Sequence, residues 1–391
     1  MHTPFPNTVR HRPRTVVIGG GVNGLGIAWM LARAGCSVDV FDAGEPGAGA
    51  SRAAAGMLAA GAEAEPGEEA LTQLGRMSQR LWPEFAEAVH AASGIDPEYR
   101  TDGLLVAAIT RDEAARVSWN YQYQQGQGVR LDWLTGAQLR EREPHLTRNV
   151  QAGVVSPDDH QVNNRALVQG LRRAAEGAGA RIHANTPVEA VVTEGGRATG
   201  VRARGEILDA EAVVLAAGAW SRGIPGVPEV ARPPVRPVKG QMLSLRMDPA
   251  APLLRHVLWA PTVYLVPRRD GTLVVGGTVE ENGFDTTITA GGLYAILQAA
   301  WRAVPAIEEL PVVETWVGFR PTSRDDAPIL GRSSVEGLWL ATGHHRNGIL
   351  LAPVTARAIA AEILGGERVD EIAPFGPERF ARGQEAAMEG P

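Results

Sequence analysis

Three glycines and one aspartate near the N-terminus have the residue types and spacing that bind a dinucleotide. Gly19, Gly21 and Gly24 form a G-x-G-x-x-G turn, and Asp42 follows the last of them by eighteen residues. The first glycine of such a turn permits a tight bend, the second lets the main chain approach a pyrophosphate, and the third lets a helix pack closely on a strand. A carboxylate at the position of Asp42 can bind the hydroxyl groups of a ribose.

The elements around this turn have the order that this chemistry requires. An apolar strand at 15–18 precedes the turn, a helical run at 25–34 follows it, and a second apolar strand at 38–41 leads to Asp42. The N-terminus of the helix presents free N–H groups and a partial positive charge to phosphates, so Val22 and Asn23 are candidate contacts as well. A lone glycine turn often marks only a flexible bend, but the complete unit favours a dinucleotide site.

Three further segments, 50–57, 215–221 and 343–353, could contact the same cofactor, because small residues let a flat ring lie against the main chain. The structural alternatives are a packing joint for the first segment and a tight strand–loop corner for the second. With Val188 from a strand between them, the candidate cofactor residues are Ser51, Ala55, Gly56, Met57, Gly218, Trp220, Gly343, His345, Arg346, Asn347, Gly348 and Ile349.

The third of these segments favours a flavin over a nicotinamide. A helix beginning near Gly348 would direct its first N–H groups at a ligand above it, and Pro353 is tolerated if it occupies the first helical turn. A helix N-terminus stabilises a ring that gains negative charge on reduction, as a flavin does at its N1/O2 edge. Because NAD gains no such charge, this feature indicates FAD.

Composition and charge limit the class of protein. A chain of 391 residues is too long for one ordinary core, so we expect two domains. The net charge of −6 gives no electrostatic footprint for nucleic acid or for an anionic membrane, and no apolar run is long enough to span a bilayer. The segment 1–14 lacks the apolar core of a signal peptide, so we expect a cytoplasmic protein.

The single cysteine, Cys36, excludes an intramolecular disulfide and a cysteine-based metal site. The nine histidines show no H-E-x-x-H or similar pairing. We therefore expect no metal.

The order of elements predicts an interrupted first domain. Helices are expected at 68–92, 111–125, 164–177 and 291–303, and strands at 103–109, 153–156, 181–183, 188–193, 200–203 and 212–216. A proline-rich extended linker at 225–238 leads to antiparallel strands at 241–247, 263–267 and 272–278, with a hairpin turn at Asp270-Gly271. The chain then returns to α/β character, with strands at 315–319 and 338–342 and a helix ending near Leu364.

Six motifs, in this order, resemble those of the D-amino acid oxidase superfamily of FAD enzymes, and most of all those of bacterial glycine oxidases linked to thiamine biosynthesis. They span most of 15–364 and read VIGGGVNGLGIAWML, SRAAAGMLAAGAE, LAAGAWS, YLVPRRDGTLVVGGT, VGFRPTSRDDAPILG and GHHRNGILLAP. The resemblance implies an α/β fold, with a Rossmann-type (GR2-like) FAD-binding domain and an inserted α+β substrate domain on an antiparallel sheet. We expect the FAD-binding domain at 1–85, 150–222 and 318–391, and the substrate domain at 86–149 and 223–317.

The resemblance also implies three active-site residues. Arg320 matches an arginine that binds the substrate carboxylate, which suits the planar two-pronged guanidinium. Tyr264 matches a tyrosine whose hydroxyl touches the same carboxylate, and Arg346 matches a second active-site arginine. The alternatives are a surface ion pair for Arg320, a half-buried sheet residue for Tyr264 and a helix-terminus contact for Arg346.

Two positions depart from the pattern of similar glycine oxidases. Val279 replaces a methionine after the strand at 272–278, and Thr262 replaces a histidine two residues before the tyrosine. Both are expected near the substrate, so the substrate's size is less defined than the reaction. The segment 63–69 could act as a lid, although an acidic solvated loop is favoured.

The implied reaction is oxidative deamination of glycine or another small D- or N-methyl amino acid. A hydride would pass from Cα to flavin N5, giving a 2-oxo acid, ammonia or amine, and hydrogen peroxide from dioxygen. The carboxylate is held so that the C–H bond is oriented, and the sequence suggests no acid–base pair. FAD should be bound noncovalently, because the only cysteine is Cys36 and 47–60 contains no histidine.

Two alternatives stay open. One is a sarcosine or D-amino acid dehydrogenase that uses an acceptor other than oxygen. The other is a flavin-binding subunit of a hetero-oligomeric amine oxidase without catalysis of its own. The sequence leaves a homo-oligomer open as well.

Overall fold

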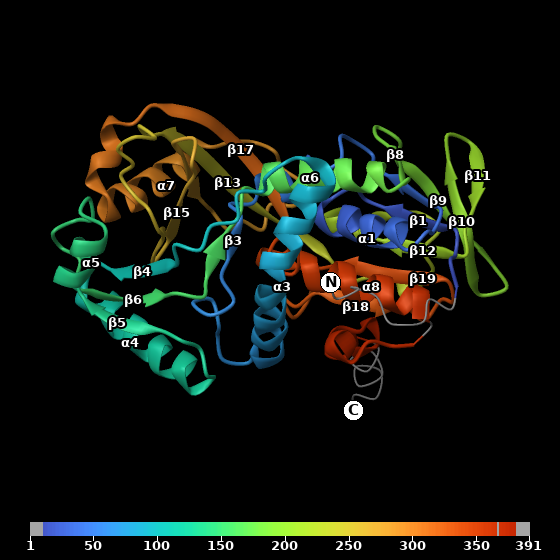
Figure 1. Ribbon diagram of the computed structural model, residues 1–391, viewed down its shortest axis with the longest axis horizontal. Coiled ribbons are helices and arrows are strands. Elements are labelled where there is room, and N and C mark those ends of the chain that lie inside the picture. Colours follow the sequence, from blue (N-terminus) through green and yellow to red (C-terminus); the bar gives the residue numbers. More distant parts are fainter. Residues whose placement is uncertain (1–10, 366, 381–391) are drawn as a thin grey trace.

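The computed structural model describes residues 11–365 and 367–380, and two β-sheets organise this part of the chain (Figure 1). Most of the segment in which we expect no signal peptide, residues 1–10, lies outside the described residues. A six-stranded sheet lies on the right in Figure 1 and an eight-stranded sheet on the left. No described helix is both long enough and apolar enough to cross a membrane.

The six-stranded sheet has the order β18-β19-β12-β1-β2-β8 and is parallel except for β18. Its strands are β1 (Thr15–Ile18), β2 (Val38–Phe41), β8 (Arg181–His183), β12 (Ala212–Leu215), β18 (Ile329–Arg332) and β19 (Leu338–Thr342). Helix α1 (Val22–Arg33) connects β1 to β2, which is the right-handed crossover of a Rossmann unit. This confirms the α/β class with a parallel sheet.

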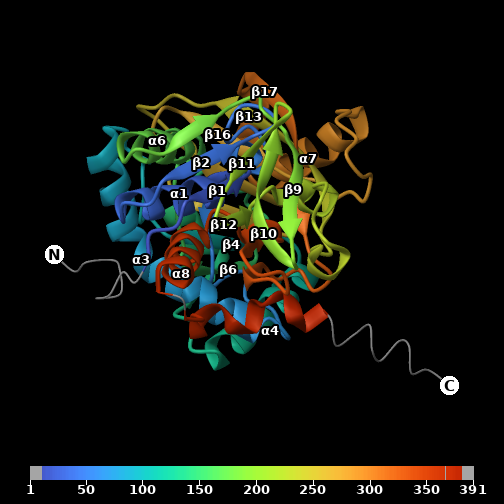
Figure 2. The ribbon, with the colours of Figure 1, turned by 90° about the vertical axis from the view of Figure 1, so that its right-hand side faces the viewer.

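Alternate side chains of the strands point to opposite faces of this sheet, and both faces are covered. Val17 and Val214 pack with α1, α6 (Asn164–Gly177) and α8 (Ala352–Gly365), whereas Val16 and Val213 face the opposite side. That side is covered by a three-stranded sheet, and Figure 2 shows the helices and this sheet on either side of β1 and β12. Its strands are β9 (Val188–Glu194), β10 (Arg197–Ala203) and β11 (Glu206–Asp209).

The eight-stranded sheet has the order β17-β13-β16-β15-β14-β4-β6-β5 and is antiparallel except for the β14–β4 pair. Its strands are β4 (Leu104–Ala108), β5 (Asp132–Thr135), β6 (Ala152–Ser156), β13 (Arg236–Arg246), β14 (Val257–Ala260), β15 (Val263–Pro267), β16 (Thr272–Gly276) and β17 (Val312–Thr322). Helix α7 (Ala290–Ala303) packs on one face, and α4 (Arg111–Gly126) packs on β4 and β6.

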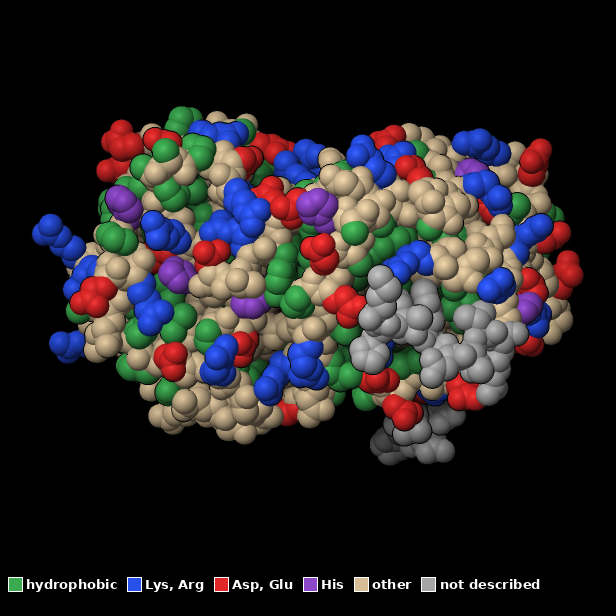
Figure 3. Space-filling view, viewed as in Figure 1, with side chains coloured by type: hydrophobic (Ala, Val, Ile, Leu, Met, Phe, Trp, Pro, Cys, Tyr) green, Lys and Arg blue, Asp and Glu red, His purple; other side chains and the backbone are tan. Residues whose placement is uncertain are grey.

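The remaining elements lie between or beside the two sheets. They are α2 (Ala50–Ala53), β3 (Met57–Leu58), α3 (Glu69–Ser93), α5 (Gly136–Arg142) and β7 (His160–Gln161). On the face shown in Figure 3, acidic and basic side chains are interspersed rather than gathered in one field.

Several sequence expectations about elements need correction. The final helix does not begin near Gly348: a short 3₁₀ turn (His345–Asn347) comes first, and α8 begins at Ala352. Pro353 therefore lies in the first turn of α8, where its missing N–H group costs no helical hydrogen bond. The stretch 225–238 is not wholly linker, because it contains a 3₁₀ turn (Glu229–Ala231) and the start of β13. Six strands, β3, β5, β7, β11, β14 and β18, and the short helices α2 and α5 were not anticipated.

The two sheets have separate hydrophobic cores, one around α1, α3, α6 and α8 and one around α7. The expected domain boundaries at 150 and 318 fall just before β6 and inside β17, and both strands belong to the eight-stranded sheet. We propose that the two domains divide along these sheets, with β6 and all of β17 on the substrate side.

Candidate active site

A cavity of about 1000 Å³ extends from the β1–α1 turn to β15 and β17. This volume lies at the upper end of the range for ligand pockets and suits an extended dinucleotide together with a small substrate. The proposed site residues that line it are Gly19, Gly21, Val22, Asn23, Asp42, Ser51, Ala55, Gly56, Met57, Val188, Gly218, Trp220, Tyr264, Arg320, His345, Arg346, Asn347, Gly348 and Ile349.

Two proposed cofactor residues, Gly24 and Gly343, are not among the lining residues. A Cβ at Gly24 would lie 2.0 Å from the carbonyl oxygen of Gly19, so this glycine serves the close approach of α1 to the turn. Gly343 has a φ of +73° and its missing Cβ would point at Ile329, so it shapes the chain after β19. Both glycines act on the main-chain geometry rather than on a ligand surface.

The glycine turn brings main chain to the cavity wall. Gly19 has a φ of +108°, and a Cβ there would lie 2.4 Å from the carbonyl oxygen of Ala216 at the end of β12. Gly21 is the N-cap of α1 and, as a glycine, has no side chain that could cap the helix. The first N–H group of the helix, that of Val22, donates to Ser51 Oγ at 2.9 Å.

Asp42 is fixed at the end of β2 by two main-chain donors. Its Oδ2 accepts from the Gly20 N–H at 2.7 Å, and its Oδ1 accepts from the Gly44 N–H at 2.9 Å. Burial raises the pKa of Asp42, while these two hydrogen bonds oppose the rise. Each carboxylate oxygen retains a second lone pair, so the held carboxylate can still accept from ribose hydroxyls.

The hydrogen bonding of Asn23 indicates whether the cavity suits a bound dinucleotide. Its Nδ2 donates to the carbonyl oxygen of Gly348 at 3.4 Å, which links α1 to the turn before α8. Its Oδ1 is buried and has no hydrogen-bond partner among the described residues. An unpaired buried acceptor is costly, so a ligand donor at this wall would remove a penalty of about 1–3 kcal/mol. The residues present therefore fit the expected cofactor.

The small residues of 50–57 serve packing as well as the cavity. A Cβ at Gly318 on β17 would lie 2.3 Å from the Cβ of Ala53, so α2 and β17 touch closely. Gly56 has a φ of +77°, and a Cβ there would meet the carbonyl oxygen of Val162 at 2.1 Å. The packing-joint alternative therefore accounts for part of this segment, while its other residues line the cavity.

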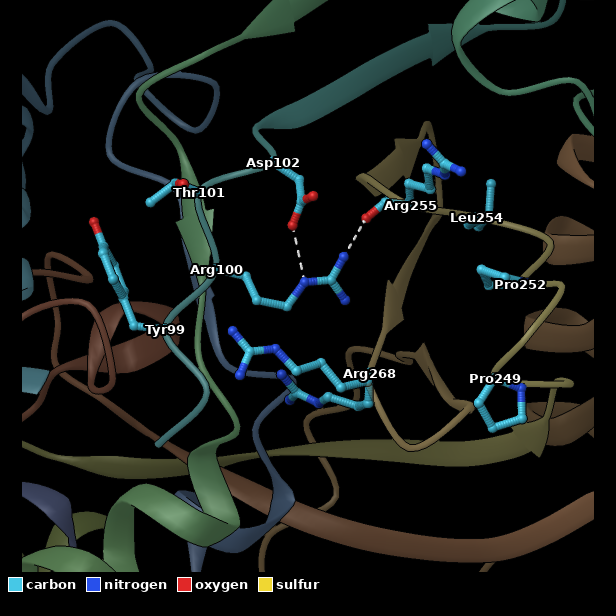
Figure 4. Close-up of a pocket in the computed structure, with 10 residues that line it drawn as sticks. Tyr99, Arg100, Thr101, Asp102, Pro249, Pro252, Leu254, Arg255 and Arg268 are labelled. Carbon is cyan, nitrogen blue, oxygen red and sulfur yellow. Dashed lines mark hydrogen bonds and ion pairs between the residues drawn. The ribbon is translucent and has the colours of Figure 1, made fainter. Parts of the chain in front are cut away.

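A buried arginine supports the loop at 50–57 on its side away from the cavity. Arg268 on the β15–β16 turn donates to the carbonyl oxygens of Ala55 and Val162, and to Asn164 Oδ1 at 3.0 Å. Burial lowers the pKa of Arg268 to about 10, so the guanidinium is still protonated at neutral pH. Arg268 also lines a second cavity of about 530 Å³, where Arg100 donates to Asp102 and to the carbonyl oxygen of Arg255 (Figure 4). Arg100 also donates to the carbonyl oxygen of Pro267 at 2.9 Å, which holds it to the segment that carries Arg268.

Arg320 and Tyr264 line the end of the cavity formed by the eight-stranded sheet. Arg320 Nη1 donates to the carbonyl oxygen of Thr278 at 3.1 Å. A Cβ at Gly240 would lie 2.8 Å from this Nη1, so the glycine makes room for the guanidinium. The Tyr264 hydroxyl donates to Met242 Sδ at 3.2 Å. Burial raises the pKa of Tyr264, and the positive charge of Arg320 opposes the rise.

Arg346 lies at the same end but its guanidinium is already paired. Nε donates to Glu63 Oε2 and Nη2 to Glu68 Oε2, both at 2.8 Å. The structure therefore brings Arg346 to the cavity together with Tyr264 and Arg320, while two carboxylates accept from its Nε and Nη2.

Glu63 is the lining residue whose chemistry sequence reasoning missed. The segment 63–69 was expected to be a solvated loop, and Glu65, Pro66 and Gly67 are indeed exposed. Glu63, however, lines the cavity with only 15% of its side chain exposed. The available signal was its position directly after the small-residue loop at 50–62. Gly240, Met242, Trp259, Gly277 and Phe319 also line the cavity and were not proposed as site residues.

The histidine pair before the last helix is uncharged at neutral pH. His345 lines the cavity, has a φ of +46°, and its Nδ1 lies 2.9 Å from Thr322 Oγ1. Burial lowers the pKa of His345 to about 4 and that of His344 to about 3. His344 is buried and its Nε2 lies 3.1 Å from Thr355 Oγ1. Neither imidazole adds positive charge to the cavity.

Aromatic side chains surround one stretch of the cavity wall. Trp220 stacks on Phe284 with ring centroids 5.1 Å apart, and Phe319 packs edge-on against both. The two positions that depart from the glycine oxidase pattern, Thr262 and Val279, both line the cavity, and Val279 is 73% exposed.

Comparisons with known proteins agree on one family. The family described as "FAD dependent oxidoreductase", DAO, matches residues 14–362. Glycine oxidase from Geobacillus kaustophilus is 36% identical over 375 residues, covering 93% of this chain and 96% of the relative. The bifunctional protein ThiO/ThiG of Trichormus variabilis is 38% identical over 378 residues, covering 94% of this chain but 55% of the relative. The chain thus spans about half the length of such bifunctional relatives.

Solved structures give the same result. The crystal structure of glycine oxidase from Geobacillus kaustophilus superimposes with a TM-score of 0.86 at 35% identity, covering 94% of this chain and 99% of that one. An iminodiacetate oxidase from a Chelativorans species has a TM-score of 0.83 at 26% identity, covering 93% of this chain and 99% of that one. The fold described above therefore recurs in a glycine oxidase and in an iminodiacetate oxidase.

Proposed function

We propose, on the premise that this chain belongs to the DAO family of FAD-dependent oxidoreductases, that it oxidises glycine and other small amino acids to 2-oxo acids. The observation that carries the proposal is that Arg320 and Tyr264 both line one end of a cavity whose other end is the glycine turn. A guanidinium and a phenol offer donors to a carboxylate, and the cavity extends from them toward the dinucleotide end.

The residues of the chain mainly orient the substrate. Arg320 is fixed by the Thr278 carbonyl oxygen, so its other donors can hold a carboxylate in one direction. FAD, when bound, supplies the two-electron acceptor. The substrate loses a hydride from Cα, and hydrolysis of the resulting imine gives the 2-oxo acid and ammonia, or an amine from an N-substituted substrate. Electrons passed on to dioxygen give hydrogen peroxide.

Noncovalent binding of FAD is part of the proposal. Cys36 is buried in the turn between α1 and β2, is not among the lining residues, and burial raises the pKa of its thiol to about 11. A protonated, buried thiol does not attack a flavin ring. Acid precipitation should leave the yellow colour in the supernatant, and colour retained in the pellet would contradict noncovalent binding.

A substrate panel tests the reaction. Purified yellow enzyme is mixed with glycine, sarcosine, D-alanine or D-proline in aerated buffer, and peroxide release is measured. We expect release with at least glycine or sarcosine. Flavin that bleaches with substrate, but turns over only when an artificial acceptor is added and releases no peroxide, would identify a dehydrogenase instead. No bleaching with any amine under anaerobic conditions would exclude amino acid oxidation by this chain.

A further inference from the structure

Two glutamates contact the same arginine but face different surroundings. Glu63 and Glu68 each place an Oε2 atom 2.8 Å from the Arg346 guanidinium. Glu63 lines the cavity, whereas Glu68 is not among the lining residues. Arg346 Nε binds only one oxygen of Glu63, and no described residue provides a hydrogen-bond partner for its Oε1. One carboxylate oxygen is therefore available inside the cavity.

The main chain on both sides of Glu63 is held in place. Asp159 is buried and its carboxylate accepts from the N–H groups of Gly61 at 2.9 Å and Ala62 at 2.7 Å. Gln124 on α4 donates to the carbonyl oxygens of Ala62 at 2.9 Å and Ala64 at 3.2 Å. These contacts come from the turn before β7 and from α4, so the position of Glu63 is fixed from two directions.

The charges at this end of the cavity match a zwitterion. The acidic side chains that line the described cavity are Asp42, Glu45 and Glu63, and the first two lie at the dinucleotide end. Glu63 is thus the carboxylate that faces the same space as Arg320 and Tyr264. An amino acid carries a carboxylate, which Arg320 suits, and an ammonium group, which needs an acceptor.

We propose that Glu63 binds the amino group of the substrate and accepts its proton, a positioning and proton-accepting role that rests on the proposed function. In this step an N–H bond of the ammonium breaks and an O–H bond forms on Glu63 Oε1, so a proton is transferred and nothing is oxidised or reduced. The substrate is then a neutral amine held between Glu63 and Arg320. Only in that form does the nitrogen have a lone pair that can support loss of hydride from Cα.

The groups around Glu63 set the pH at which it can act. Burial raises the pKa of Glu63 to about 7, the charge of Arg346 opposes this rise, and the carboxylates of Asp159 and Glu68 add to it. Tyr264 on β15 lines the same cavity as Glu63. A carboxyl with a raised pKa is protonated below that value and can accept a proton only above it. The rate of flavin reduction should therefore increase as the pH passes through about 7.

The experiment compares E63Q with E68Q, which removes the other partner of Arg346. Flavin reduction by glycine is followed anaerobically in the holoenzymes between pH 5.5 and 9 (roughly one and a half to two units either side of the midpoint). E63Q should raise the apparent Kd for glycine about tenfold or more and lose the rise near pH 7. Binding of glycolate, which has no amino group, should change less than threefold by flavin absorbance. E68Q should keep the pH-dependent rise.

Three outcomes would overturn the inference. They are an unchanged pH profile in E63Q, an equal loss of the rise in E68Q, and glycolate binding that weakens as much as glycine binding. If E63Q does not retain FAD, E63D is used in its place. Its shorter carboxylate should keep the rise near pH 7 but weaken glycine binding. An E63D variant that binds glycine as tightly as E68Q would again overturn the role. Wild-type enzyme that no amine reduces refutes the proposed function itself.

Discussion

The two ends of the cavity are built from different materials. At the dinucleotide end the wall consists mostly of glycine, alanine and other small residues, which leave main chain at the surface, from the β1–α1–β2 unit at 15–42 and from the segments 43–57 and 216–224. At the substrate end the wall consists of charged and aromatic side chains from β15, β17, the 3₁₀ turn before α8 and the loop after β3. A main-chain wall depends on the absence of Cβ atoms, whereas a side-chain wall depends on charge.

The largest expected effect is at the side-chain end. R320A removes the guanidinium held by the Thr278 carbonyl oxygen, so the substrate carboxylate loses its charged partner. Loss of one partner of a desolvated charge pair costs about 3–4 kcal/mol, which corresponds to a fall of about 10²–10³-fold in kcat/KM. The measurement is steady-state oxidation of glycine, and FAD content should equal that of wild type.

A matched control is R324A, because Arg324 is an exposed arginine just after β17. It should leave kcat/KM within a factor of about two. Equal losses in R320A and R324A would mean that general charge, rather than a specific clamp, attracts the substrate.

The next largest effect is expected from a substitution at the dinucleotide end, where main chain forms the wall. G24A places a Cβ 2.0 Å from the Gly19 carbonyl oxygen, and both atoms belong to main chain that cannot rotate away. Overpacking costs about 1–3 kcal/mol, and this contact with main chain lies at the upper end of that range and moves the turn. We expect a lower melting temperature and loss of bound FAD in the purified protein.

Gly291 provides the control, since it lies in the first turn of α7 and nothing lies within 4 Å of its missing Cβ. G291A should melt at the same or a slightly higher temperature, because alanine stabilises a helix by about 0.5–1 kcal/mol relative to glycine. If G24A retained wild-type FAD content and melting temperature, the close packing of α1 on the turn would not be essential.

The smallest effect concerns Arg268, which extends from the β15–β16 turn and donates to the carbonyl oxygens of Ala55 and Val162. R268M leaves the buried carbonyl oxygens of Ala55 and Val162 without their donor. We expect a loss of about 2 kcal/mol in the free energy of unfolding and weaker FAD binding, with little change in KM for glycine. Urea unfolding and FAD titration of the apoprotein would measure both.

The neighbouring Arg269 serves for comparison, because its side chain is 57% exposed and pairs with Asp96 at 3.2 Å. An exposed pair contributes at most about 1 kcal/mol, so R269M should unfold almost like wild type. Equal destabilisation by both variants would contradict the support of the loop at 50–57 by Arg268.

Local patterns predicted much of the dinucleotide end. The expected bounds 38–41, 164–177 and 338–342 coincide with β2, α6 and β19, because hydrophobic periodicity and turn residues act over a few neighbours. The start of the final helix was wrong, since the 3₁₀ turn at His345–Asn347 depends on tertiary contacts of His344 and Thr322 that no local pattern contains.

The substrate end was predicted only through motif resemblance, and incompletely. Arg320, Tyr264 and Arg346 were named, and all three line the cavity. The pairing of Arg346 with Glu63 joins residues 283 positions apart, and β14, which pairs with β4 from the other half of the chain, gave no strong local signal. Contacts of such range depend on how the sheets assemble.

By itself the sequence determined the glycine turn after β1, the acid after β2 and the order of the motifs, because each is a property of adjacent residues and their main-chain freedom. Tertiary structure alone decided which charges share the cavity: it turned Glu63 inward, joined it to Arg346 and left Glu68 outside. The reason is physical, since burial and pairing of a charge depend on every element that surrounds it.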